Sequence, residues 1–277
     1  MTITYVLILL LTGAGAGLAS GLLGIGGGII LVPALCWIAD LMGFGLFSMK
    51  IAVATSAAVI LPTAISGVLR HNKKKAVRWR AALILGPCGA AGSILLGARL
   101  ANILPNDILK IVFGILLLII AAWMGIGKTR ALKSAKEIIE NKPTKINPVA
   151  LAALGFPVGV LAGLAGIGGG AVMVPAMVIA LGFVMHEAVG TSTGAVAFIS
   201  MGSIIYWIVN SQGITGTLPP YSIGYINGLM WLCLVVTSIP MAQLGAKLAH
   251  DLPAKQLQYI FIALLIYLGL RMLGVFG

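Results

Sequence analysis

Long stretches of this sequence carry no charged side chain, and that limits the possible folds more than any other feature. No Asp, Glu, Lys or Arg occurs between residues 3 and 39. Hydrophobic residues make up 60% of the 277 residues and charged residues 9%. A chain of this composition does not form a water-soluble domain, and a helix of about 20 apolar residues crosses a bilayer. The sequence therefore predicts an all-α polytopic membrane protein.

Further apolar stretches follow along the rest of the chain. They cover residues 51–69, 81–98, 111–127, 146–185, 188–246 and 256–270. Several of them are long enough for one helical crossing or two, so we predict roughly 8–10 transmembrane segments. No Lys or Arg precedes the first apolar run, which argues against a cleaved signal peptide. The first helix is therefore expected to be retained.

The net charge of +12 is concentrated in two short segments. Residues 70–80 contain six basic side chains and no acidic one, and residues 128–145 contain six basic and two acidic ones. Together these segments hold ten of the twelve net positive charges. Both lie between apolar spans, as is typical of cytoplasmic loops. We therefore attribute the basic charge to membrane topology and expect no nucleic-acid partner.

A nineteen-residue segment occurs twice in the chain. Residues 17–35 read GLASGLLGIGGGIILVPAL, and residues 159–177 read GVLAGLAGIGGGAVMVPAM. The similarity continues more weakly on both sides of these segments, so the chain consists of two homologous transmembrane repeats, residues 1–127 and 148–277. The charged residues 128–147 between them predict a basic cytoplasmic linker with one or two helical turns.

The relative orientation of the two repeats follows from a difference in charge. The loop HNKKKAVRWR at residues 71–80 corresponds to the uncharged loop SQGITGTLPPYS at residues 211–222. Loops on opposite sides of the membrane explain this contrast, which favours inverted repeats of five segments each with both termini outside. The stretches 29–39 and 171–182 are short for a full span. If they re-enter instead, eight crossings and parallel repeats with both termini inside result.

Each repeated segment contains a cluster of glycines followed by a proline. Glycine destabilises a helix by about 1 kcal/mol per residue, so we expect the helix to unwind there. Within a membrane, the freed backbone N–H groups are satisfied only by protein, water or a ligand, and a helix N-terminus favours an anion. Broken segments at equivalent positions of two repeats are typical of a transporter's binding site. The candidate substrate-binding glycines are Gly24, Gly26, Gly27, Gly28, Gly166, Gly168, Gly169 and Gly170. The alternative is a purely structural hinge.

Hydroxyl side chains follow each glycine cluster at equivalent positions. They are Thr55 and Ser56 in the first repeat and Thr191 and Ser192 in the second. They can cap the start of the next long helix, donate hydrogen bonds to an oxyanion, or do both.

Ionisable residues precede the Thr-Ser pairs. His186 is equivalent to Lys50, and Glu187 is its neighbour. Ionisable groups within a membrane are functional candidates, so His186 and Glu187 form a candidate proton-coupling pair. The alternative is that these side chains lie at the interface and extend into water.

Enzyme and metal signals in the sequence are weak. Residues 190–194 match the G-x-S-x-G pattern of a serine hydrolase, but the equivalent residues 54–58 keep Thr-Ser and lack both glycines. What repeats is Thr-Ser, so we interpret the match as chance and expect no enzyme. The three cysteines occur singly, without metal-ligand spacing. We therefore expect no metal, disulfide or cofactor.

The order of these motifs resembles the TauE/SafE sulfite exporter family, also called the TSUP permeases. The resemblance rests on the doubled G-L-x-G-I-G-G-G with V-P four residues later, on the following A-V-[AG]-T-S, and on the basic loop. It implies a transporter of the bacterial inner (plasma) membrane, without a cofactor, for sulfite, organosulfonates or other small sulfur-containing anions. It also places the family's motifs on the glycines and Thr-Ser residues named above. Lys50 departs from strict symmetry of the two half-sites.

A site of backbone N–H groups and hydroxyls can bind such anions without a metal. The sequence thus predicts a secondary transporter of small anions that works by alternating access, with rocking of the two halves. Its partners are the anionic substrate and the lipid bilayer. A passive anion channel is the alternative, because pores can use the same donors. An intramembrane serine hydrolase is a distant third.

Overall fold

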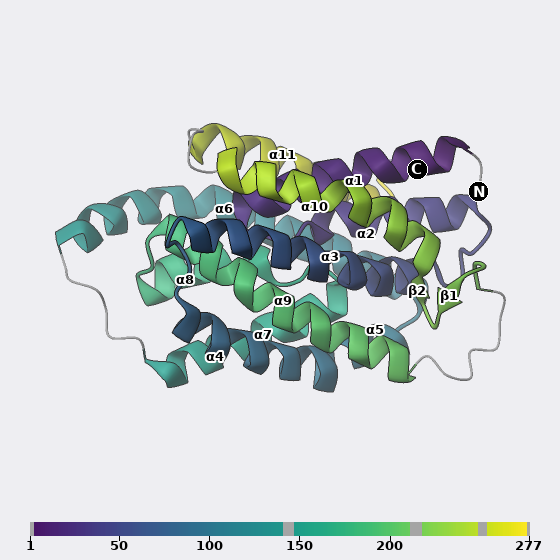
Figure 1. Ribbon diagram of the computed structural model, residues 1–277, viewed down its shortest axis with the longest axis horizontal. Coiled ribbons are helices and arrows are strands. Elements are labelled where there is room, and N and C mark those ends of the chain that lie inside the picture. Colours follow the sequence, from purple (N-terminus) through teal and green to yellow (C-terminus); the bar gives the residue numbers. More distant parts are fainter. Residues whose placement is uncertain (1–2, 141–146, 211–217, 249–253, 276–277) are drawn as a thin grey trace.

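The computed structural model describes residues 3–140, 147–210, 218–248 and 254–275, and the side chains in these ranges apart from residues 124, 126–140 and 254–261. Helices account for nearly all of the described chain (Figure 1). The first repeat begins with α1 (Ile3–Leu23), α2 (Gly28–Leu41), α3 (Ser48–Lys73), α4 (Trp79–Gly92), the π-helix η1 (Ser93–Gly97) and α5 (Ala98–Ile103), and α6 (Asn106–Glu140) continues beyond its predicted end at residue 127. The second contains α7 (Pro148–Ala165), α8 (Gly170–Leu181), α9 (Met185–Asn210), β1 (Ser222–Ile223), β2 (Ile226–Asn227), α10 (Gly228–Leu248) and α11 (Ala254–Met272).

The helices have the lengths and composition of membrane spans. Seven helical stretches of the described ranges are long and apolar enough to cross a membrane, and α2, α8 and Ile262–Met272 are shorter apolar helices. Large apolar side chains such as Leu11, Ile103 and Ile119 are more than half exposed, which a lipid surrounding makes favourable. The predicted all-α polytopic membrane protein is confirmed.

Helix α6 extends well into the predicted linker. It runs without a break from Asn106 to Glu140, whereas the sequence predicts only one or two helical turns within residues 128–147. Residues 141–146 lie outside the part that the structure describes. Residues 128–140 continue the helix of the apolar segment before them, and no proline interrupts residues 106–140.

The central helices α3 and α9 are equivalent in sequence and run in opposite directions. Both have 26 residues, and they cross the middle of the molecule side by side (Figure 1). The backbone N–H of Arg78, just after α3 ends, donates to Thr191 Oγ1 near the start of α9, 3.0 Å away. Asn227, which follows the end of α9, donates in the same way to Thr55 near the start of α3. Each helix therefore begins where the other ends.

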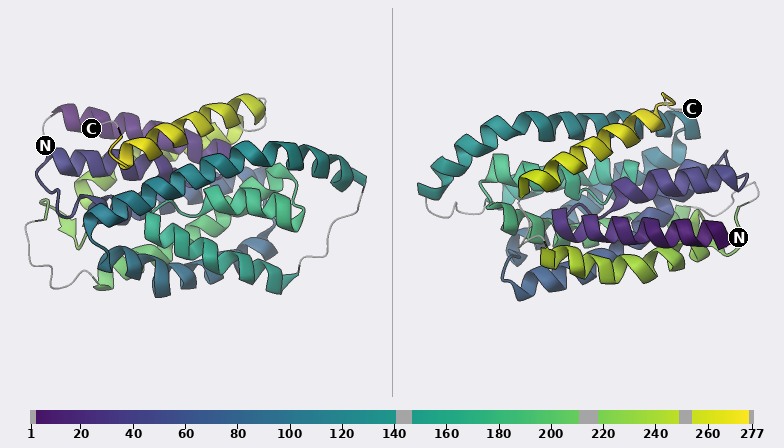
Figure 2. Two further views of the ribbon diagram at one scale, coloured as in Figure 1. Left: turned by 180° about the vertical axis from the view of Figure 1, so that it is seen from behind. Right: turned by 90° about the horizontal axis from the view of Figure 1, so that it is seen from above.

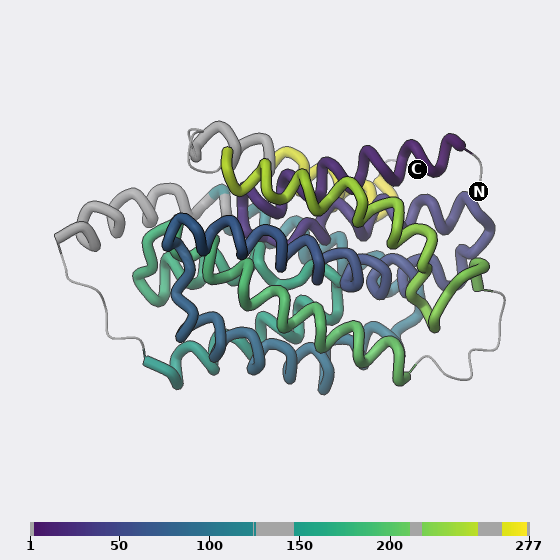
Figure 3. Tube along the Cα trace, in the orientation of Figure 1, coloured from purple at the N-terminus to yellow at the C-terminus, as the bar shows by residue number. Residues whose placement is uncertain are grey.

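Helix α2 returns toward the end of the molecule at which α1 begins. The Cα trace shows α1 running inward from that end and α2 running back to it from the centre (Figure 3). Helix α8 starts near the centre too and runs toward the opposite end. Both ends of the described chain lie toward the same end of the molecule's long axis, although on different faces, and away from the basic connection between α3 and α4 (Figure 2).

The fourth helix of each repeat packs on the first helix of the other repeat. Helix α1 contacts α10, and α7 contacts α4, along stripes of glycine. A Cβ added to Gly17 would lie 2.6 Å from Ser238 Cα, and one added to Gly159 would lie 2.5 Å from Gly89 Cα. Such contacts are typical of small-residue packing in membranes. The two halves therefore do not form two separate bodies, whereas the predicted rocking of the halves assumed that they do.

Helices α4 and α10 are thus exchanged between the repeats, and two four-helix units result. One consists of α1, α2, α3 and α10, and the other of α7, α8, α9 and α4. In Figure 1 the α1 and α10 pair lies along one edge, the α4 and α7 pair along the opposite edge, and α3 and α9 meet between them.

Gly17→Ala is expected to destabilise the protein by about 1–3 kcal/mol, because the new methyl group overpacks the contact with α10. Gly15→Ala, in the same helix, is the matched control, since no atom lies within 4 Å of a Cβ at that position. Thermal unfolding in detergent measures the difference. Equal melting temperatures for the two variants would contradict the close packing of α1 on α10.

Candidate functional site

Each glycine cluster breaks the backbone between two helices. Helix α1 ends at Leu23 and α2 begins at Gly28, while α7 ends at Ala165 and α8 begins at Gly170. Three glycines in each break have positive φ: 68°, 80° and 78° at Gly24, Gly26 and Gly27, and 68°, 73° and 84° at Gly166, Gly168 and Gly169. Only glycine adopts these left-handed values readily. The predicted unwinding is confirmed in both repeats.

The two breaks contact each other at the centre of the molecule. A Cβ on Gly28 would lie 2.5 Å from Ile167 Cα, and a Cβ on Gly170 would lie 2.6 Å from Ile25 Cα. Both isoleucines are buried. The N-termini of α2 and α8 thus meet, although 142 residues separate them in the sequence.

The N-termini of α2 and α8 have no side-chain cap. Gly27 and Gly169 occupy the N-cap positions, and neither can supply a side-chain acceptor. Their carbonyl oxygens accept the first helical hydrogen bonds, for example from Leu31 N at 3.1 Å and from Met173 N at 2.9 Å. The first N–H groups of a helix have no acceptor within it and carry partial positive charge. Two such helix ends converge here.

Ser56 and Ser192 tie each break to the central helix of the other repeat. Ser56 Oγ donates to the carbonyl oxygen of Gly166 at 2.8 Å, and Ser192 Oγ donates to that of Gly24 at 3.2 Å. The two contacts are reciprocal, because each joins equivalent positions of opposite repeats. Both serines are fully buried.

Thr55 and Thr191 accept hydrogen bonds from the connections that precede the exchanged helices. Thr55 Oγ1 accepts from Asn227 N at 3.0 Å, and Thr191 Oγ1 accepts from Arg78 N at 3.0 Å. Both threonines lie about two turns inside α3 and α9. The interpretation of these hydroxyls as N-caps is therefore wrong. Helix α3 begins at Ser48, well before Thr55, and the side chain that accepts from its first turn is Asn106, whose Oδ1 lies 2.8 Å from Met49 N.

An ion pair lies at the basic end of this region. Glu187 Oε2 and Arg78 Nη2 are 2.6 Å apart, and the Arg78 guanidinium lies 4.9 Å from the centre of the Phe183 ring. The side chain of His186 is exposed. The structure thus joins Glu187 to Arg78, which the sequence analysis assigned to topology alone. Nothing in the local pattern distinguishes Arg78 from the other basic residues of its loop.

A second cation lies at the opposite end. Lys50 Nζ donates to the carbonyl oxygen of Asn102 at 2.6 Å and lies 5.8 Å from the centre of the Tyr225 ring. Tyr225 belongs to the turn between β1 and β2, and its burial raises the pKa of its phenol. Its ring packs edge-on against Trp207. Each end of the α3 and α9 pair thus has one cation beside an aromatic ring.

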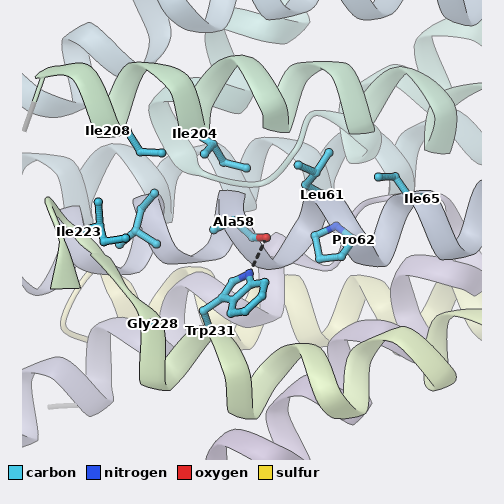
Figure 4. Close-up of a pocket in the computed structure, with 10 residues that line it drawn as sticks. Ala58, Leu61, Pro62, Ile65, Ile204, Ile208, Ile223, Gly228 and Trp231 are labelled. Carbon is cyan, nitrogen blue, oxygen red and sulfur yellow. Dashed lines mark hydrogen bonds between the residues drawn. The ribbon is translucent and has the colours of Figure 1, made fainter. Parts of the chain in front are cut away.

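A groove of about 430 Å³ lies between α3, α9 and α10 (Figure 4). Its lining is apolar apart from Trp231, whose Nε1 donates to Ala58 O at 3.0 Å. That carbonyl is free because Pro62, four residues on, has no N–H. The groove offers no free donor, so it does not suit an anion. It does separate α9 of one four-helix unit from α3 and α10 of the other.

The G-x-S-x-G match lies within one continuous helix. A nucleophile elbow needs a strand, a sharp turn and a helix, whereas residues 190–194 are all inside α9. The backbone of Ala76 packs against Gly190 and leaves no room for a side chain there. Within the described ranges, no three His, Cys, Asp or Glu side chains could together hold a metal ion.

The family described as sulfite exporter TauE/SafE matches residues 9–272, which include both glycine breaks. The chain belongs to this family. A probable membrane transporter protein of Methanocaldococcus jannaschii is 32% identical over 96% of this chain and 94% of its own length. Another, of Haemophilus influenzae, is 30% identical over 97% and 98%. The probable membrane transporter protein YunE of Bacillus subtilis is 30% identical over 98% of both chains. No solved structure matches the chain.

The TauE/SafE family consists of membrane transporters and is not an enzyme family. The protein is therefore a multi-pass membrane transporter, and the hydrolase interpretation is wrong.

Proposed function

We propose that this transporter moves small anions by alternating access, and that the two crossed glycine breaks with the neighbouring hydroxyls form its binding site. One observation carries the proposal. The uncapped N-termini of α2 and α8 converge at the centre, and the buried hydroxyls of Ser56 and Ser192 lie beside them. Oriented N–H groups and hydroxyls in a membrane interior suit an anion. In the present conformation, the hydroxyls bind protein carbonyls, so the site is closed.

The proposed substrates are sulfite, organosulfonates and related sulfur-containing anions. The family description points to sulfite, and none of the buried side chains in the described ranges is a carboxylate that would repel an anion. A sulfite or sulfonate group presents three oxygens, which can each accept from a backbone N–H or a hydroxyl. The basic segment at residues 70–80 raises the local anion concentration at one entrance.

We further propose that the repeats are inverted and that the two four-helix units are the moving bodies. The opposite directions of α3 and α9 and the reciprocal serine contacts support inversion. In such folds, one unit tilts against the other around a fixed central site. Because α4 and α10 are exchanged, the proposed motion separates α1, α2, α3 and α10 from α7, α8, α9 and α4.

Proton coupling through His186 and Glu187 is a further part of the proposal. A proton on the Glu187 carboxylate would remove its charge and release Arg78. This release would link the protonation state at the basic end to the contacts of Thr191, because the backbone N–H of Arg78 donates to that hydroxyl.

Uptake of radiolabelled sulfite and of ethanesulfonate into proteoliposomes tests the proposed function. We expect saturable uptake that an imposed pH gradient accelerates, together with exchange against unlabelled anion inside. Liposomes without protein, and liposomes with heat-unfolded protein, are the controls.

Two results would contradict the proposal. Large single-channel currents without saturation would indicate a passive anion channel, because a channel does not close between ions. No uptake of either anion by folded protein would remove the sulfur-anion assignment and leave only the membrane transporter.

A further inference from the structure

The ion pair of Arg78 and Glu187 lies at the outer start of a polar path to the glycine breaks. Arg78 belongs to the connection between α3 and α4, and Glu187 to the first turn of α9. Their side chains are 27% and 30% exposed, although the Glu187 oxygen that contacts Arg78 is itself buried. A partly exposed pair contributes little to stability, typically about 1 kcal/mol or less. A function other than stability therefore has to be considered.

Arg78 is held in place by contacts other than the carboxylate. Its guanidinium lies over the Phe183 ring at 4.9 Å, and its backbone N–H donates to Thr191 Oγ1. A guanidinium beside an aromatic ring still has N–H groups that bind oxygen atoms. Neither of these two contacts involves Glu187, so another oxyanion could take the place of the carboxylate.

The surroundings of this pair are strongly basic. Lys75 and Arg80 are exposed nearby, and His71 and His186 belong to the adjoining helix ends. Of the acidic side chains that the structure describes, Asp40 and Asp107 belong to the opposite end, where α2 ends and α6 begins. Glu187 is thus the one described carboxylate at this end. An anion that arrives here meets an attractive potential and a single internal competitor.

Polar contacts continue from Arg78 to the centre. Arg78 N contacts Thr191, the next residue Ser192 donates to Gly24 O, and Gly24 begins the first glycine break. A Cβ on Gly24 would lie 2.7 Å from Val189 O, so α9 packs directly on this break. Thr191, Ser192 and Gly24 thus join Arg78 to the candidate site.

We propose that Arg78 is an anion-binding residue of the transport route and that Glu187 occupies its site when no substrate is bound. This inference rests on the proposed function. The ligand is a small oxyanion with a sulfite, sulfonate or carboxylate group, since each presents paired oxygens that a guanidinium edge binds as it binds Glu187. The incoming anion displaces Glu187, and the freed carboxylate turns toward the surrounding lysines.

The test compares Glu187→Gln, Arg78→Gln and Arg80→Gln for the KM of sulfite uptake in proteoliposomes and for the Kd of ethanesulfonate in detergent. Glu187→Gln removes the competitor, so both constants are expected to fall by about threefold or more. Arg78→Gln removes a charged donor, so both are expected to rise at least about tenfold. Arg80→Gln removes an exposed charge from the same basic segment, so it is the matched control and is expected to raise both constants by less than about twofold. Arg78→Lys keeps the charge and the fold and is expected to raise both constants by a smaller factor.

The sign of the shifts decides the outcome. A purely structural ion pair is broken equally by Glu187→Gln and Arg78→Gln, so shifts in the same direction, or no shift in either, overturn this inference while wild-type transport stands. Wild-type protein that neither binds nor transports either anion overturns the proposed function, and this inference with it. Opposite shifts in the two variants support the displacement of Glu187 by substrate.

Discussion

Gly28→Ala combined with Gly170→Ala is expected to abolish transport while the protein stays folded in the membrane. The added Cβ atoms would lie 2.5 Å from Ile167 Cα and 2.6 Å from Ile25 Cα. Backbone atoms cannot rotate away as a side chain can, so the N-termini of α2 and α8 must separate. At about 1–3 kcal/mol for each overpacked contact, we expect sulfite uptake to fall at least about 100-fold.

Gly194→Ala is the matched control for this variant. Gly194 lies in α9 near the same depth, and a Cβ there would make only ordinary contacts, 3.4 Å to Ala82 Cβ and to Val68 Cγ2. It is expected to transport like the wild type. Uptake by the Gly28→Ala and Gly170→Ala protein at the wild-type rate would show that the crossing of the breaks is not the transport site.

Ser56→Ala combined with Ser192→Ala is expected to reduce transport about 10- to 100-fold and to lower the melting temperature. The change leaves the carbonyl oxygens of Gly166 and Gly24 without these donors in the buried centre. An unpaired buried acceptor costs about 1–3 kcal/mol, and measured side-chain bonds in membranes contribute about 0.6–2 kcal/mol. Because the two contacts are reciprocal, we expect Ser56→Ala alone and Ser192→Ala alone to have effects similar to each other.

Ser66→Ala provides the comparison for the serine variants. Ser66 is buried in the same helix as Ser56 and donates to the carbonyl of Ile239 at 3.1 Å, away from the breaks. It is expected to lower stability without a specific loss of uptake. If uptake falls in proportion to the loss of stability in both Ser66→Ala and the serine double variant, the central serines have no specific function in transport.

Features that depend on neighbours in the chain were predicted well. The apolar runs indicated the helices because each span must satisfy its own backbone hydrogen bonds in lipid. The glycine clusters indicated the breaks between α1 and α2 and between α7 and α8, because left-handed backbone values favour glycine. The stripe of Gly13, Gly17 and Gly21 in α1 packs closely on α10, an arrangement that glycines four residues apart favour.

Predictions that needed a distant partner fared less well. The hydroxyl of Thr191 was compatible with an N-cap, yet it accepts from Arg78, 113 residues earlier. Thr55 accepts from Asn227, 172 residues later, beside a short hairpin that the sequence analysis did not predict. Glu187 was interpreted with its neighbour His186, whereas the structure pairs it with Arg78. No local pattern carries such information.

The sequence by itself determined that this chain spans a membrane as two related sets of helices, and where each set is broken. Hydrophobic length and glycine conformation are local properties, so a single stretch of residues specifies them. Only the tertiary structure decided that α4 and α10 exchange between the repeats and that the breaks of α2 and α8 cross. These contacts depend on the fit of backbone surfaces more than a hundred residues apart, and a glycine at 17 does not by itself specify that a serine at 238 is its neighbour.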